Sequence, residues 1–247
     1  MRRTLFASLL TALALPLLVT ACGSTSATSA DKSAEKQSNS SSAETTVPKV
    51  DPAAFRAGMA WFFTDSSATT PVSLPADLST CTATKLDEAD ASTIAGLKSA
   101  SASDSLPDPV GIRVFRATLA CDRGTVEALF VKQIDLAKLG ADATQQTCVT
   151  TGLMDSIATL DDTKATGKGG EAMSVPFGAA LDKCIPLAQG LAAILADPSN
   201  GIPASSVDCI AGAAAKALTW AQVVDNTNQA AVKAAMQAAA AGCTSGN

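Results

Sequence analysis

Seven cysteines are the residues whose type and spacing point most directly to chemistry in this chain. Cys22 follows an apolar segment near the amino terminus, and the other six are at least 25 residues apart from one another. Such wide spacing contains neither a Cys-x-x-Cys redox motif nor a zinc-binding motif. In an exported chain an even number of cysteines predicts disulfides. Three disulfides are expected among Cys81, Cys121, Cys148, Cys184, Cys209 and Cys243.

Histidine is absent from all 247 residues, and its absence excludes several kinds of site. A Ser-His-Asp triad, a Cys-His dyad and an imidazole metal ligand all need the missing side chain. A formal net charge of −5 argues against a nucleic-acid partner, because affinity for nucleic acid rests largely on clustered Lys and Arg. We therefore expect no metal, no cofactor and no nucleic acid, and we expect that the protein is not an enzyme.

Carboxylates are the remaining candidates for acid–base catalysis. A hydrolase of this kind would need two of the glutamates that follow residue 50 to face each other across a cleft, and these are Glu88, Glu127 and Glu171. We expect Glu127 on the exposed side of a helix. The acidic clusters at 87–90 and 161–162 lack the spacing of an EF-hand and are expected to be solvated loops. The sequence Thr-Gly-Lys-Gly-Gly at 166–170 lacks the full phosphate-loop pattern and predicts a mobile connector.

The amino-terminal segment has the features of a secretory signal. Arg2 and Arg3 precede an apolar stretch from residue 5 to residue 19, which ends in small residues. The four residues Val19-Thr20-Ala21-Cys22 resemble the lipobox of bacterial lipoproteins. This resemblance implies that residues 1–21 are removed and that Cys22 carries a thioether-linked diacylglycerol, often with a further acyl chain such as palmitate on its amino group.

Acylation at Cys22 predicts a protein that is attached to the membrane without spanning it, because two or three acyl chains anchor a chain stably. The alternative is an uncleaved transmembrane helix, since the apolar stretch is near the lower length limit for a span. Pro16 and the lipobox favour the cleaved form. The two arginines fit both the general secretory route and a loose twin-arginine signal, so the export route stays open.

Residues 22–50 separate this anchor from the rest of the chain. They are rich in Ser, Thr and Ala and contain almost no large apolar side chain, so they cannot bury enough surface to fold. A flexible segment of this length has a root-mean-square span of about 30 Å. We therefore expect a disordered tether that holds a folded domain, residues 51–247, clear of the lipid headgroups.

The cysteines of this domain form two interleaved series with a common period. Cys81, Cys148 and Cys209 lie 67 and 61 residues apart, and Cys121, Cys184 and Cys243 lie 63 and 59 residues apart. A shared period in two series indicates a threefold repeat of about 60–65 residues. Apolar residues recur 11, 7 and 4 positions before each cysteine of the second series, which is one face of an α-helix. They are Val110, Val114 and Ala117, then Met173, Phe177 and Ala180, then Val232, Met236 and Ala239.

A second pattern marks where the first helix of each repeat begins. Leu74-Pro75-Ala76 and Ile202-Pro203-Ala204 lie at the same distance before Cys81 and Cys209, and Ala141-Asp142-Ala143 is the degenerate middle copy. Because proline is tolerated in the first turn of a helix, a helix is expected to begin just after each copy. Each repeat would then contain a first helix, a polar connector and a second helix, with an amphipathic segment before it. The sequence therefore predicts an all-α domain of three helical hairpins.

The repeat favours a disulfide within each hairpin. The expected pairs are Cys81 with Cys121, Cys148 with Cys184, and Cys209 with Cys243, and each would close a loop worth roughly 4 kcal/mol in the chain-entropy model. Pairing across repeats remains an alternative, because sequence alone does not determine connectivity. We expect alanine-lined helix interfaces to bury little apolar area, so that the disulfides offset a weak core.

The lipobox, the Ala-, Thr- and Ser-rich composition and the polar segment are similar to secreted lipoproteins of high-GC Gram-positive bacteria. The resemblance implies a lipid-anchored position on the extracytoplasmic face of the cell membrane and no particular activity. We expect a non-catalytic helical module that binds an envelope protein or a cell-wall partner. The alternatives are a carrier of a small apolar or lipid-like ligand between the helices and, least favoured, a histidine-free carboxylate hydrolase.

Overall fold

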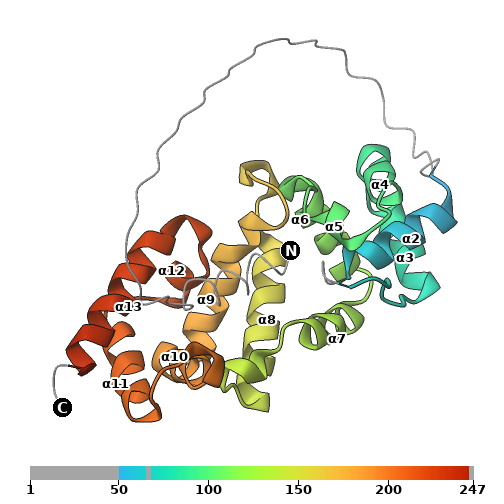
Figure 1. Cartoon of the computed structure of the whole chain (residues 1–247). Helices are drawn as coiled ribbons and strands as arrows, with labels where there is room; N and C mark the ends of the chain where they lie inside the picture. Colours follow the sequence, from blue (N-terminus) through green and yellow to red (C-terminus); the bar gives the residue numbers. More distant parts are fainter. Residues whose placement is uncertain (1–49, 65–67, 245–247) are drawn as a thin grey trace, which may run out of the picture.

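The computed structural model describes residues 50–64 and 68–244, and within these ranges helices joined by turns and short loops make up the fold (Figure 1). The described residues contain no strand, and one isolated bridge joins Pro107 to Lys168. The predicted all-α class is confirmed.

Three helical units follow one another across the molecule in chain order, from blue-green through yellow to red in Figure 1. Unit 1 contains α3 (Ala76–Thr84), α4 (Glu88–Ala95), α5 (Ala100–Ser103) and α6 (Asp108–Leu119). Unit 2 contains α8 (Ala143–Thr159), the short 3-10 helices η3 (Asp162–Lys164) and η4 (Glu171–Met173), and α9 (Ser174–Cys184). Unit 3 contains α11 (Ala204–Ala214), α12 (Trp220–Val224), η6 (Asn226–Asn228) and α13 (Gln229–Thr244).

A lead helix precedes each unit, as the amphipathic segments predicted. These helices are α2 (Pro52–Phe62), α7 (Arg123–Gln133) and α10 (Leu187–Leu195), with η2 (Leu136–Leu139) following α7 and η5 (Pro198–Asn200) following α10. Each lead helix packs against the first helix of its unit. The chain turns sharply between α9 and α10, where the two helices are bent by 101°. Among the described residues, no single helix has the length and apolarity of a membrane span, although this bent pair has them in combination.

The predicted helix starts are confirmed in all three units. The first helices begin at Ala76, Ala143 and Ala204, each one residue after the proline or aspartate of the repeated pattern. In the middle copy, the Asp142 side chain accepts a hydrogen bond from the backbone of Gln145 and completes a capping box. An aspartate therefore starts the helix by capping where the other two copies use the fixed backbone of a proline.

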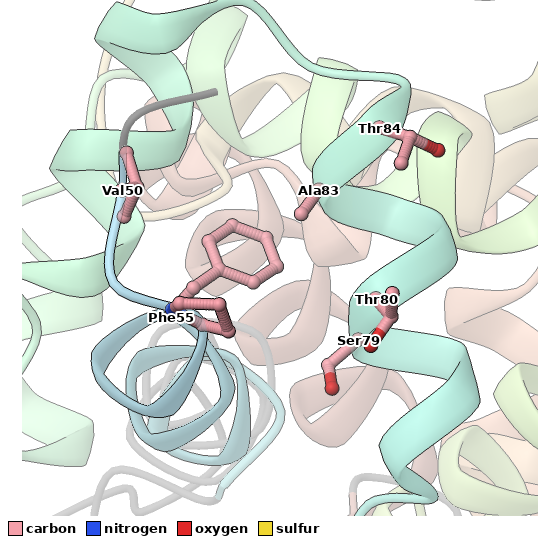
Figure 2. A pocket seen from close by; sticks show the side chains of 7 residues that line it. Val50, Phe55, Ser79, Thr80, Ala83 and Thr84 are labelled. Atoms are coloured by element: carbon pink, nitrogen blue, oxygen red, sulfur yellow. The ribbon is translucent and has the colours of Figure 1, made fainter. Parts of the chain in front are cut away.

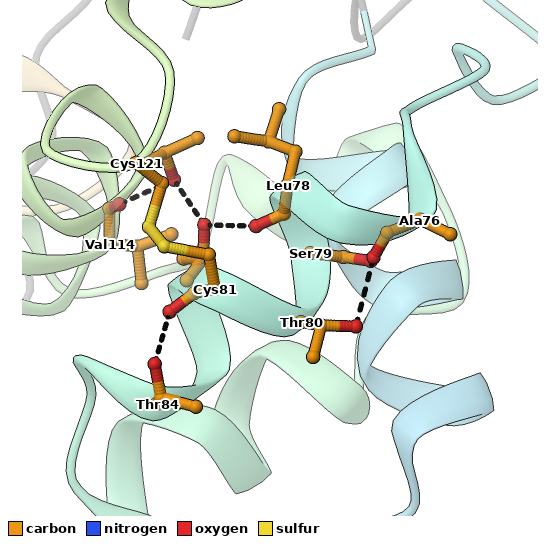
Figure 3. The surroundings of a disulfide bond; sticks show 10 residues. Ala76, Leu78, Ser79, Thr80, Cys81, Thr84, Val114 and Cys121 are labelled. Atoms are coloured by element: carbon orange, nitrogen blue, oxygen red, sulfur yellow. Dashed lines mark hydrogen bonds between the residues drawn. A yellow bond between two sulfur atoms is a disulfide. The ribbon is translucent and has the colours of Figure 1, made fainter.

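The three disulfides have the predicted pairing within units. Their Cα–Cα distances are 5.9 Å for Cys81–Cys121, 5.7 Å for Cys148–Cys184 and 5.8 Å for Cys209–Cys243. Figure 3 shows the first of them, which joins α3 to the carboxyl end of α6. Beside this bridge, the buried hydroxyls of Thr82 and Thr118 lie 3.5 Å apart and each bonds to a carbonyl of its own helix. The alternative of pairing across repeats is wrong.

The periodic apolar residues before the second-series cysteines form the inner face of their helices. All of them are buried except Val110, which is half-buried against the core. The core is richer in large side chains than the alanine content predicted, since Phe62, Phe63 and Phe115 form an aromatic cluster. In α13 the buried face is Val232, Met236 and Ala239, whereas most other alanines of that helix face solvent. The expectation of alanine-lined interfaces is therefore wrong for much of the domain.

Neighbouring units meet where the second helix of one unit packs on the connector of the next. At the first junction, α6 of unit 1 packs on η3 and α8 of unit 2. At the second junction, α9 of unit 2 packs on α12 of unit 3. These two junctions hold the units in a fixed series, and they differ in chemistry.

Candidate functional site

The predicted lipidation site lies outside the described residues, as do the signal segment 1–21 and all of the tether except Val50. The six disulfide cysteines are all described, and their exposure differs along the chain. Cys184 is buried, Cys209 is exposed, and the other four are half-buried. The bridge of unit 3 is therefore the most accessible of the three to solvent.

The three candidate glutamates lie in different elements. Glu88 is in the first turn of α4, Glu171 begins η4, and Glu127 is in α7. Glu127 accepts a hydrogen bond of 2.6 Å from Arg123 one turn earlier on its own helix, and its side chain is 30% exposed. The three carboxylates therefore lie in separate parts of the fold. Among the described residues, no hydrogen bond or ion pair links any two of them.

The acidic cluster at 87–90 is the start of a helix, so the prediction of a solvated loop is wrong there. Asp87 caps α4 by accepting a hydrogen bond from the backbone of Asp90. Asp90 itself is buried, with a side chain only 5% exposed. Its two carboxylate oxygens accept bonds of 2.5 Å and 2.8 Å from Arg113, a bidentate geometry that binds a carboxylate strongly.

A second carboxylate joins this pair across the first junction. Asp162 in η3 accepts from Arg113 at 3.0 Å and pairs with Arg116 at 3.1 Å. Arg116 also donates to the backbone oxygen of Leu160. The prediction of a solvated loop at 161–162 is thus wrong for Asp162, whose side chain is 16% exposed, whereas Asp161 is exposed and caps η3.

The charges of this network perturb one another in the expected directions. The hydrogen bond from Arg113 lowers the pKa of Asp162 below its usual value, partial burial opposes that shift, and Arg116 adds to the lowering. The bond to Asp90 is the largest cause that raises the pKa of Arg113. Asp162 and Arg113 are therefore both charged over the neutral pH range, and each stabilises the charge of the other.

The segment 166–170 is tied to the start of α6, so the prediction of a mobile connector is wrong. The buried carboxylate of Asp108 accepts from the backbone of Gly170 at 2.6 Å and of Ala172 at 2.7 Å. Gly169 donates to the oxygen of Leu106 and has a left-handed backbone, with φ of 66°. A Cβ at this position would also lie 2.5 Å from the oxygen of Asp104. These bonds give the loop a structural role at the first junction.

An apolar cavity lies between α2 and α3 near the beginning of the described chain (Figure 2). Phe55 and Val50 line one side, and Ala83 and the hydroxyl-bearing Ser79 and Thr80 line the other. Its volume is about 110 Å³. Pockets for small-molecule ligands usually measure about 300–1,000 Å³, so this cavity is too small to enclose a lipid chain.

Sequence reasoning missed the two arginines that organise the first junction. Arg113 and Arg116 are two of only four arginines after residue 50, and they lie three positions apart on one helix. Their scarcity and their shared helix face were available signals, but their partners are 23 and 49 residues away from Arg113. Among the described residues, no group of three or more His, Cys, Asp or Glu side chains is placed to hold a metal ion.

We compared the chain with known proteins and found no relative. No protein-family model, no curated protein and no solved structure matches the chain.

Proposed function

We propose that this protein is a lipid-anchored, non-catalytic binding module on the extracytoplasmic face of a bacterial cell membrane. In this proposal, residues 1–21 direct export, Cys22 carries the lipid, and residues 22–50 connect the anchor to the helical units. The units present a rigid, extended surface to an envelope protein or a cell-wall partner.

The observation that carries the proposal is the set of three disulfides within units. Disulfides persist in oxidising compartments and are rare in the cytosol of most organisms. A chain that uses all six cysteines of its folded part in disulfides therefore fits an exported protein. The seventh cysteine, Cys22, stands next to the signal-like segment, in the position where the lipobox resemblance requires an acylated cysteine.

A binding role is supported by the way the units are joined. The helices of each unit are linked covalently, and both junctions are held by hydrogen bonds or close packing between elements of adjacent units. Such a series preserves the relative positions of surface side chains, and rigid presentation lowers the entropic cost of binding. The cavity between α2 and α3 gives little support to the alternative of a lipid carrier, because of its small volume.

The anchor is tested by intact mass spectrometry of the protein extracted from membranes. We expect a chain that begins at Cys22 and carries the mass of a diacylglycerol. A Cys22→Ala variant behind a conventional cleavable signal is expected in the soluble fraction with an unchanged helical circular dichroism spectrum. An extracted chain that still contains residues 1–21 would identify an uncleaved span and reject the lipid anchor.

The binding role is tested by crosslinking on intact cells. A photoreactive side chain at Val175, which is 65% exposed on α9, is expected to capture a discrete envelope partner. The same group at the buried position Val149 serves as the control and is expected to capture nothing if the variant folds. Native mass spectrometry of the soluble Cys22→Ala form separates the carrier, which would retain a lipid-sized mass, from the binding module.

A further inference from the structure

A shallow depression beside the first junction gathers cations in this otherwise acidic protein. It has a volume of about 530 Å³ and lies between α6 and the turn that links α3 to α4. Lys85, Arg113 and Arg116 contribute three positive charges to its lining, against two negative charges from Asp87 and Asp90. Leu86 and Ala117 provide apolar surface at the same place.

The carboxylates near this depression are already engaged. Both oxygens of Asp90 bind Arg113, and one oxygen of Asp87 accepts from the backbone at the start of α4. On the other side of the arginines, the two oxygens of Asp162 are divided between Arg113 and Arg116. These carboxylates hold the two arginines in place, and they do not use every N–H donor of the arginines.

Two cations of the depression keep free donors. The exposed side chain of Lys85, at the carboxyl end of α3, makes no ion pair or hydrogen bond with any described residue. Arg116 uses Nη2 for Asp162 and Leu160, whereas its Nη1 is not buried and donates to no described residue. A guanidinium with an unused, accessible donor and an unpaired Lys85 side chain line the same depression, and an anion there would bond to both.

We propose that this depression binds a compact anionic group, a phosphate or a carboxylate, between Lys85 and Arg116. Lys85 and Arg116 contact the anion, and Arg113, fixed by Asp90, contributes its charge from the side. The net charge of −5 opposes a long polyanion, so the ligand is compact. This inference deepens the proposed binding function by naming a ligand class, but it does not depend on the lipid anchor.

The test is a titration of the full-length chain with inorganic phosphate at constant ionic strength, with the protein in a neutral detergent and binding followed by calorimetry. Acetate is titrated in parallel as the carboxylate probe. We expect saturable binding of at least one of the two anions. Lys85→Gln and Arg116→Gln are each expected to weaken it about tenfold, the effect of losing one hydrogen bond to a charged group.

The matched control is Lys216→Gln, which removes the same charge from an exposed lysine after α11 in unit 3. An equal loss of affinity in this control would reveal diffuse electrostatics and overturn the proposal. Thermal unfolding is measured for every variant, because Arg116→Gln also removes a partner of Asp162. Lys85→Gln changes only an exposed, unpaired side chain, so unchanged affinity in that variant overturns the site whatever Arg116→Gln does.

Two further arms distinguish the source of the phosphate. The chain is reconstituted in vesicles of phosphatidylcholine alone and of phosphatidylcholine mixed with phosphatidylglycerol. If a lipid headgroup occupies the site, the mixed vesicles weaken the binding of inorganic phosphate, and Lys85→Gln abolishes this competition. Equal phosphate binding in both vesicles identifies a free or polymer-borne anion. Phosphate binding that survives Cys22→Ala separates the anion site from the anchor, so failure of one proposal is distinguishable from failure of the other.

Discussion

The two junctions between units use the same topology and opposite chemistry. At the first, Arg113 and Arg116 of α6 reach the carboxylate of Asp162 in η3. At the second, Trp220 of α12 is fully buried, and its indole nitrogen donates to the oxygen of Ile185 at 2.7 Å. One junction is a partly exposed ion network. The other is a buried ring contact, at whose edge Asp182 of α9 accepts hydrogen bonds from the backbone of Trp220 and Ala221 at the start of α12.

The second junction includes a close approach of two backbones. Gly178 lies six residues before Cys184, and a Cβ there would come within 2.5 Å of the backbone of Ala221. The equivalent position, six residues before Cys121, is Phe115, which packs into the aromatic cluster of unit 1. Glycine at this position therefore lets the backbone of α12 approach α9 closely, whereas Phe115 is used inside its own unit. The comparison teaches that the same position of the repeat serves a junction in one unit and the core in another.

The largest loss of stability is expected when the buried ring of Trp220 is removed from the second junction. Trp220→Ala deletes a fully buried side chain and leaves the oxygen of Ile185 without its donor. We expect a loss of roughly 3–5 kcal/mol in the free energy of unfolding. The measurement is urea denaturation followed by circular dichroism. The control Val175→Ala, at a position 65% exposed, is expected to change stability by less than about 0.5 kcal/mol, and an equal effect in both would contradict the assignment.

Removing the disulfide of unit 3 tests whether packing at the second junction is enough to keep that unit folded. Replacing Cys209 and Cys243 with Ala is expected to cost up to about 4 kcal/mol in the chain-entropy model. Hydrogen exchange is expected to show lost protection in α13, whose buried face is small, while α9 and α12 stay protected. Lost protection in α12 as well would show that the apolar junction depends on the bridge.

The matched control for that experiment is the disulfide of unit 1. Replacing Cys81 and Cys121 with Ala removes a loop constraint of similar length, since the sequence separations are 40 and 34 residues. The aromatic cluster around Phe115 is expected to keep the helices of unit 1 protected from exchange. The contrast between the two double variants measures how much each end of the molecule relies on packing.

The ion network of the first junction is expected to be worth less than the apolar contact of the second. Arg113→Met leaves the buried carboxylate of Asp90 without its bidentate partner. We expect a loss of about 1–2 kcal/mol, reduced from the value for a fully buried pair because Arg113 is 36% exposed. Arg123→Met, which breaks the more exposed pairs with Glu127 and Asp155, is the control and is expected to cost less than about 1 kcal/mol. Equal costs would show that burial of Asp90 adds nothing.

The smallest expected effect is the pH dependence of the first junction. The pKa of Asp162 is lowered in the folded protein, so its ion pairs stabilise the fold above the ordinary aspartate pKa of about 3.9. This contribution is lost as the pH falls through the lowered pKa. Asp162→Asn is therefore expected to reduce stability at neutral pH and to converge with the unchanged protein in acid. A difference that persists at low pH would mean that the asparagine acts through packing instead.

Features with a local or covalent cause were predictable from the sequence. The helix starts after Pro75 and Pro203 follow from the backbone of proline, and the buried face of α9 follows from helical period. Features that depend on distant partners were not predictable. Asp90 was expected in a solvated loop because Asp and Glu usually face water, and its burial depends on Arg113. The loop at 166–170 was expected to be mobile, although Asp108 holds it from 62 residues away.

The sequence by itself determined the all-helical class and the threefold repeat, because helical period and the shared spacing of the cysteines are properties of the chain. It favoured a disulfide within each repeat, and the structure decided that pairing. Only the tertiary structure decided how the units meet. The contacts across each junction join side chains from separate units, such as the ring of Trp220 at one and the guanidiniums of Arg113 and Arg116 at the other, and these partners are distant in the sequence. The tertiary structure also brings Lys85 and Arg116 into the lining of one depression. No pattern along the chain indicates that these two residues share a site.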